Sequence, residues 1–181
     1  MPTISPQIEA YLHRLGFSSN QFSRLTSGSA EALSDLQYAH VHHVPSETLD
    51  ILAGVPFSLD TAAVYDKVVT RGRGGYCFEL NGLFCWLLTQ LGYAPQQRFA
   101  RFLREETQIP MRRHRVLKVA AEGRWYLCDV GVGGIAPAGP FCWRREWSSP
   151  RGRSATRYPK SPFSAGCCGS STTDSGAGSS P

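Results

Sequence analysis

The chain has 181 residues, 41% of them hydrophobic, which is typical of a globular protein with a packed core. It has neither an apolar run of about eighteen residues nor a basic, apolar amino terminus, so we expect a soluble, cytoplasmic protein without a membrane partner. The net charge of +5 lies mostly in residues 140–181, and the 13 basic and 12 acidic residues before them exclude a basic face for nucleic acid.

Helical spacing dominates the first half of the sequence. Residues 5–15 place apolar side chains on one face, and Ser29 is a candidate cap for a second helix with apolar residues at helical intervals. Asp60 is a candidate cap for a third helix that runs to Val69 and ends at the glycine-rich residues 72–75. Residues 78–91 are strongly apolar and predict the most buried helix.

Strand signals follow from residue 96 onward. Residues 96–103, 114–121 and 124–130 are rich in Val, Leu and aromatic residues, and Glu122-Gly123 predicts a tight hairpin between the last two segments. In such a hairpin, opposite positions have numbers that sum to roughly 245. His114 is therefore expected within about two residues of Asp129.

The composition changes near residue 140, and we divide the chain there. Residues 1–92 predict a helical domain that contains Cys77, and residues 93–139 predict a strand-rich domain that contains His114 and Asp129. Residues 140–181 contain no Leu, Ile, Val or Met, so a disordered tail is expected. The abrupt change suggests the hypothesis of a frameshifted or truncated carboxyl terminus.

Cys77 lies just after two glycines and at the start of the apolar helix. The amides and the macrodipole of a helix amino terminus favour the thiolate, which is the nucleophilic form of cysteine. The same amides are able to donate hydrogen bonds to the oxyanion of a tetrahedral intermediate. We expect His114 to take the thiol proton and Asp129 to orient the imidazole, which makes a catalytic triad for acyl transfer.

The other cysteines and histidines have simpler interpretations. Cys85 and Cys128 are expected to be small buried hydrophobic groups. The remaining histidines are expected to be ordinary surface or core groups, namely His13, His40, His42 and His43. No CxxC pair occurs among the six cysteines, so no metal site is predicted and reduced thiols are expected.

Four segments, in order, carry a resemblance to a known family. Residues 73–81 (RGGYCFELN) resemble the nucleophile signature of arylamine N-acetyltransferases, and residues 129–134 (DVGVGG) resemble that family's aspartate motif. His114, with Val116, Leu117 and Val119 after it, is similar to the family's histidine strand. Residues 45–50 (PSETLD) resemble an upstream Pro-Phe-Glu-Asn-Leu segment.

The resemblance implies an α+β fold, in which a helical bundle (residues 1–92) precedes a partial β-barrel (residues 93–139) within a cysteine-proteinase-like core. We expect the third α/β domain that covers the site in this family to be missing. The implied chemistry is ping-pong acetyl transfer from acetyl-CoA, a cosubstrate rather than a bound cofactor, to arylamines, arylhydrazines or arylhydroxylamines. Gly131, Gly133 and Gly134 are the implied binding residues for acetyl-CoA, and Glu47 and Arg73 are expected to form a buried ion pair.

Departures from the family pattern keep alternatives open. Ser46 and Thr48 replace an aromatic residue and an amide, and Val132 replaces a phenylalanine, so the shape of the substrate pocket is not predicted. One alternative is a Cys-His-Asp acyltransferase or hydrolase of the papain or transglutaminase type. The other is a truncated remnant without turnover. The sequence predicts no oligomeric state.

Overall fold

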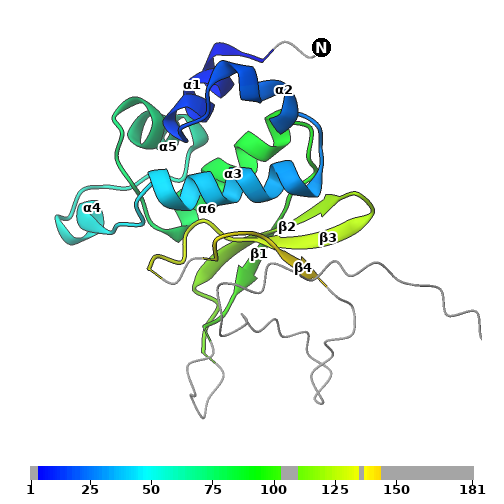
Figure 1. Ribbon diagram of the computed structural model, residues 1–181. Helices are drawn as coiled ribbons and strands as arrows, with labels where there is room; N and C mark the ends of the chain where they lie inside the picture. The colour runs from blue at the N-terminus through cyan, green and yellow to red at the C-terminus, as the bar shows by residue number, and fades with distance from the viewer. Residues whose placement is uncertain (1–3, 103–109, 135–136, 144–181) are drawn as a thin grey trace, which may run out of the picture.

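The computed structural model describes residues 4–102, 110–134 and 137–143, and Figure 1 shows helices stacked on one side of an antiparallel sheet. This arrangement confirms the mixed helix-and-sheet class. Helix α6 (Cys77–Gln90) packs against strand β2 (His114–Ala121) and thereby joins the two layers. The start of α6 and the start of β2 hold Cys77 and His114.

The helical layer begins with capped helices, of which the Ser29 cap was predicted from the sequence. Ser5 accepts a hydrogen bond from the amide of Ile8, and Ser29 accepts one from that of Ala32. Three short elements were not predicted, namely η1 (Ser19–Gln21), α2 (Phe22–Leu25) and α4 (Leu49–Leu52), because each is a single turn without a periodic pattern. The longer helices are α1 (Pro6–Arg14) and α3 (Ala30–His43).

The third predicted helix is not uniform. Asp60 caps α5 (Thr61–Tyr65) through bonds from the amides of Ala62 and Ala63. The chain then widens into a π-helical turn, η2 (Asp66–Thr70), in which the amide of Arg71 bonds the carbonyl of Asp66 at 2.9 Å. A π turn inserts extra backbone into a helix, and such turns are frequent at functional sites.

The sheet has the strand order β1-β2-β3-β4, with β1 (Gln96–Ala100), β3 (Arg124–Cys128) and β4 (Phe141–Trp143) antiparallel to their neighbours. Glu122 and Gly123 both have positive φ, 49° and 71°, as a tight two-residue hairpin requires. Leu117 pairs with Cys128, which confirms the predicted register. Strands β1 and β3 end earlier than predicted, at Ala100 and Cys128.

The sheet bears on two predictions. In the described residues the sheet is open, since β1 and β4 are each paired along one side, so the partial β-barrel stays a prediction. The predicted tail is wrong at its start, because residues 141–143 form β4 and pair with residues 125–127. The rest of that tail, residues 144–181, lies outside the described part of the chain.

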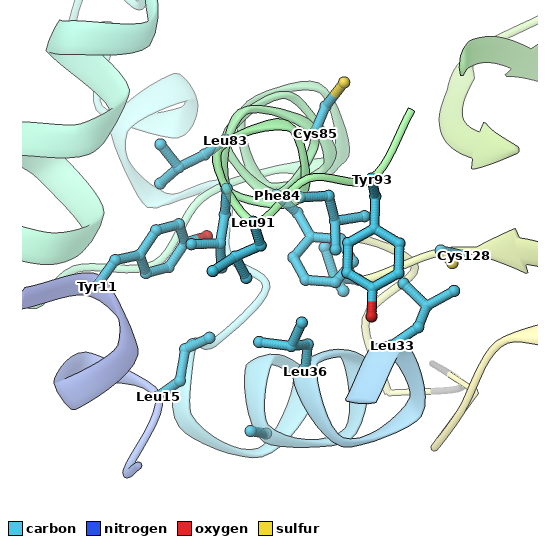
Figure 2. Packing of buried hydrophobic residues seen from close by; sticks show 14 of the residues in the cluster. Tyr11, Leu15, Leu33, Leu36, Leu83, Phe84, Cys85, Leu91, Tyr93 and Cys128 are labelled. Carbon is cyan, nitrogen blue, oxygen red and sulfur yellow. The ribbon is translucent and has the colours of Figure 1, made fainter. Parts of the chain in front are cut away.

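The hydrophobic core lies between the helices and the sheet. In Figure 2, side chains of α1, α3 and α6 converge there, including those of Tyr11, Leu36 and Phe84. Cys85 and Cys128 are buried in this cluster, as predicted. Burial raises the pKa of both thiols, so neither is prepared to act as a nucleophile.

In the described ranges, no helix has both the length and the apolar character to cross a membrane.

Candidate active site

Cys77 is the first residue of α6, with Tyr76 as its N-cap residue. Its side chain is partly exposed, and its sulfur lies 4.0 Å from the carbonyl oxygen of Arg113. The first amides of a helix have no partner within the helix, and they carry the positive end of the dipole. The position places the sulfur beside these amides and leaves it accessible to a substrate.

His114 begins β2 and lies between Cys77 and Asp129. Its Nε2 is 2.5 Å from the Oδ2 of Asp129, and the two residues are only 2% and 1% exposed. Burial lowers the pKa of His114, but hydrogen bonds to Asp129 and Cys77 and the charges of both outweigh it and raise the pKa to about 9. The three residues predicted as a triad are thus brought together, with His114 between the thiol and the carboxylate.

Asp129 is held by residues that the sequence did not single out. Asn81 donates its Nδ2 to the Oδ1 of Asp129 at 3.0 Å and to the carbonyl of Arg115 at 2.7 Å, and its Oδ1 accepts from the amide of Val130 at 3.1 Å. Gln37 accepts from the amide of Asp129 at 3.2 Å. The sequence offered one signal for this role of Asn81, namely an amide side chain within an apolar helix. Asn81 is fully buried, and a buried amide needs hydrogen-bond partners.

The three glycines predicted to bind acetyl-CoA have different surroundings. A Cβ on Gly131 would lie 2.6 Å from the Cα of Cys77, so only glycine permits the approach of this loop to α6. Gly133 and Gly134 instead line a cleft of about 280 Å³, together with Val41, Val44, Ser46 and Val130. Gly133 has φ +80°, a conformation that favours glycine.

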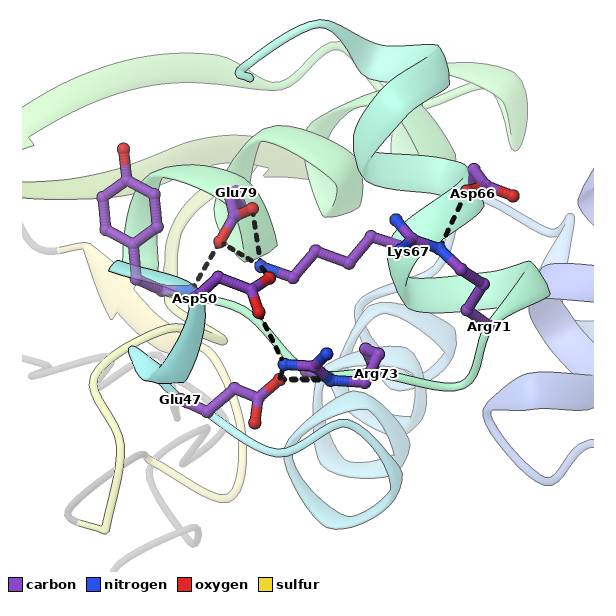
Figure 3. A network of polar contacts seen from close by, with 9 residues as sticks. Glu47, Asp50, Asp66, Lys67, Arg71, Arg73 and Glu79 are labelled. Carbon is purple, nitrogen blue, oxygen red and sulfur yellow. Dashed lines mark hydrogen bonds and ion pairs between the residues drawn. The ribbon is translucent and has the colours of Figure 1, made fainter. Parts of the chain in front are cut away.

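The loop before Cys77 is clamped by the segment at residues 45–50. Ser46 and Gly75 form a parallel bridge, and the amide of Glu47 bonds the carbonyl of Gly75 at 2.9 Å. The expected ion pair is present, because the Oε1 of Glu47 is 3.0 Å from an Arg73 nitrogen (Figure 3). It is less buried than predicted, since the Arg73 side chain is 40% exposed.

The remaining histidines take part in local contacts. His40 is fully buried and bonds the hydroxyl of Tyr11 at 2.9 Å, and burial lowers its pKa to about 3. His13, His42 and His43 each bond a backbone carbonyl. Over the described ranges, no three His, Cys, Asp or Glu side chains gather in a way that could hold a metal ion.

The segment that matches known proteins includes Cys77, His114 and Asp129. A family profile described as N-acetyltransferase matches residues 29–158. The arylamine N-acetyltransferase of Mycobacterium tuberculosis is 38% identical over 140 residues, which are 74% of this chain and 48% of that protein. A Salmonella typhimurium protein, named arylamine N-acetyltransferase / N-hydroxyarylamine O-acetyltransferase, is 39% identical over 114 residues, 62% of this chain and 41% of its own length.

Solved structures give the same match in three dimensions. The arylamine N-acetyltransferase from Salmonella typhimurium superposes with a TM-score of 0.73 at 34% identity, over 81% of this chain and 52% of that one. The Mycobacterium marinum enzyme in complex with CoA has a TM-score of 0.65 at 36% identity, over 74% of this chain and 49% of that one. The chain spans about half the length of the curated relatives it matches.

Proposed function

Because the chain belongs to the arylamine N-acetyltransferase family, we propose that it transfers an acetyl group from acetyl-CoA to an arylamine through a thioester on Cys77. The observation that carries the proposal is the contact of His114 with both Cys77 and Asp129. This arrangement supplies a nucleophile, a proton carrier and an orienting carboxylate in one place. Arylhydrazines and arylhydroxylamines are proposed as further acceptors, and the cytoplasm as the location.

In the first half-reaction the thiolate of Cys77 attacks the carbonyl carbon of acetyl-CoA. The C–S bond to CoA then breaks, CoA leaves as its thiol with a proton from His114, and Cys77 carries the acetyl group. Asp129 stabilises the imidazolium before that proton is given up. The oxyanion formed on the way lies near the first amides of α6, which are positioned to donate hydrogen bonds to it.

In the second half-reaction the amino group of the acceptor attacks the thioester carbonyl. His114 takes a proton from the nitrogen, the C–S bond to Cys77 breaks, and the thiolate is regenerated beside the imidazolium. Each half-reaction passes through one tetrahedral intermediate, so a single direct transfer is divided into two easier steps. The cleft lined by Gly133 and Gly134 is the proposed entry for the acyl donor.

Product analysis tests this proposal. The chain is incubated with acetyl-CoA and an arylamine, and both free CoA and the N-acetylated arylamine are measured by chromatography. Equal amounts of the two products, lost in a Cys77→Ser variant and in a His114→Gln variant, are expected. CoA release without acetylated amine would instead favour the Cys-His-Asp hydrolase alternative, and absence of both products from a folded chain would favour a remnant without turnover.

A further inference from the structure

Lys67 is nearly buried, yet no step of the proposed reaction uses it. It is 8% exposed and lies in the π-helical turn η2. Its Nζ is 3.0 and 3.2 Å from the two carboxylate oxygens of Glu79 and 2.9 Å from an oxygen of Asp50, as Figure 3 shows. Burial lowers the pKa of Lys67, but these bonds raise it above its ordinary value, so the side chain is a cation.

Glu79 connects this cation to the nucleophile. It is the third residue of α6, two positions after Cys77, and its Oε2 accepts a hydrogen bond from the amide of Tyr76 at 3.0 Å. The same oxygen lies only 2.9 Å from the place that a Cβ on Gly75 would take. The Glu79 carboxylate therefore packs directly beneath the two residues that precede Cys77.

Lys67 also reaches the other end of the turn. Its carbonyl accepts a hydrogen bond from the amide of Arg73 at 3.0 Å, and Asp50, its second carboxylate partner, accepts one from the Arg73 side chain at 2.9 Å. One residue is thus bonded, through its main chain and its side chain, to both ends of residues 73–79. We propose that Lys67 is a positioning residue, which acts through Glu79 and Asp50 to hold the turn that presents Cys77.

The charge balance around the turn gives Lys67 a second effect on Cys77. Glu47, Asp50 and Glu79 supply three carboxylates, and Lys67 and Arg73 supply two cations. Without Lys67, the nearly buried Glu79 would carry an uncompensated negative charge in the first turn of α6. A negative charge there disfavours the thiolate, which the helix amino terminus otherwise stabilises.

Other charged groups also face this turn. His114 and Asp129 approach from the sheet, and the guanidinium of Arg115 donates to the carbonyl of Phe78 at 2.8 Å. None of these groups bonds Lys67, so we expect them to stay in place in a Lys67 variant, and the effect on Cys77 then reports the contacts of Lys67 with Glu79 and Asp50. The inference rests on the proposed role of Cys77 as the nucleophile.

The test is the rate at which iodoacetamide alkylates Cys77, measured by peptide mass spectrometry between pH 5 and 10. In Lys67→Met, we expect the midpoint of the rate profile to move up by roughly one pH unit and the rate at pH 7 to fall about tenfold. Lys67→Arg keeps the charge and should restore most of the rate. Arg71→Met is the matched control, because Arg71 pairs with Asp66 at the exposed side of the same turn.

A double variant, Lys67→Met/Glu79→Gln, covers the case in which the single variant does not fold. It leaves no lone buried carboxylate, so the midpoint should return close to that of the wild type while the maximal rate stays several-fold lower. A profile of Lys67→Met or of the double variant that matches the wild type in midpoint and maximal rate would overturn the inference. A wild-type Cys77 that reacts no faster than Cys142 would overturn the proposed nucleophile itself, and the inference with it.

Discussion

At the residue scale, the two oxygens of Asp129 have separate partners. Oδ2 bonds His114, while Oδ1 accepts from Asn81 and from the amide of Gly131, both at 3.0 Å. Because each oxygen is engaged, the carboxylate cannot rotate without breaking a buried hydrogen bond. The orientation of the imidazole therefore depends on Asn81 as well as on Asp129.

Replacing Asn81 with Ala is expected to lower both stability and reactivity. Asp129 Oδ1, the carbonyl of Arg115 and the amide of Val130 each lose a partner, and at a buried position we expect a cost of about 2–4 kcal/mol in the free energy of unfolding. Urea denaturation measures this cost, with Gln7→Ala at an exposed position as the control. A cost under about 0.5 kcal/mol would show that water replaces the amide.

The raised pKa of His114 predicts how stability depends on pH. The folded value of about 9 exceeds the ordinary value of 6.5, so the folded state binds the proton more tightly than the unfolded state. The contribution of His114 to the free energy of unfolding is therefore complete below about pH 6.5 and is lost as the pH rises through about 9.

Urea denaturation of the wild type and of His114→Gln at pH 6 and pH 9.5 measures this contribution. The stability advantage of the wild type should shrink between the two pH values. An advantage that stays constant or grows with pH would contradict a protonated His114 in the folded protein.

At the element scale, the β2–β3 hairpin places His114, the proposed base, and the start of α6 places Cys77, the proposed nucleophile. The hairpin could be predicted because Glu122-Gly123 sets the turn and the turn sets the register, which brings His114 near Asp129. The π turn η2 could not be predicted, since a shift of one hydrogen-bond step leaves no trace in the hydrophobic pattern. Lys67 lies in this turn, so its position beside Glu79 and Asp50 could not be predicted either.

The contact between the loop after β3 and the start of α6 can be tested with a glycine substitution. A methyl group at Gly131 would lie 2.6 Å from the Cα of Cys77 and 2.9 Å from the Nδ2 of Asn81, so the loop must move. We expect Gly131→Ala to cost about 1–3 kcal/mol of stability and to slow alkylation of Cys77.

Gly134→Ala is the matched control, because no atom lies within 4 Å of the added methyl group. Its thermal denaturation midpoint and its rate of alkylation should remain those of the wild type. If the two variants behave alike, the close approach of Gly131 to Cys77 is not what fixes the nucleophile.

At the scale of the whole molecule, the described residues bring the three residues of the predicted triad together where the helical layer meets the sheet. The proximity of Cys77, His114 and Asp129 and the mixed helix-and-sheet class could be predicted from motif order and periodicity. Closure of the sheet into a barrel could not be predicted from these patterns, because closure depends on pairing between distant strand edges. In the described ranges, the edge strands β1 and β4 are not paired with each other. The chain spans about half the length of its relatives, so the direct test of acetyl transfer is whether Cys77 becomes acetylated.

The most direct measurement is the intact mass of the chain after incubation with acetyl-CoA. A single acetyl adduct is expected, which should be absent from Cys77→Ala and should disappear when an arylamine is added. An adduct that persists in Cys77→Ala, or no adduct on a folded wild-type chain, would contradict a thioester on Cys77 as the intermediate of transfer.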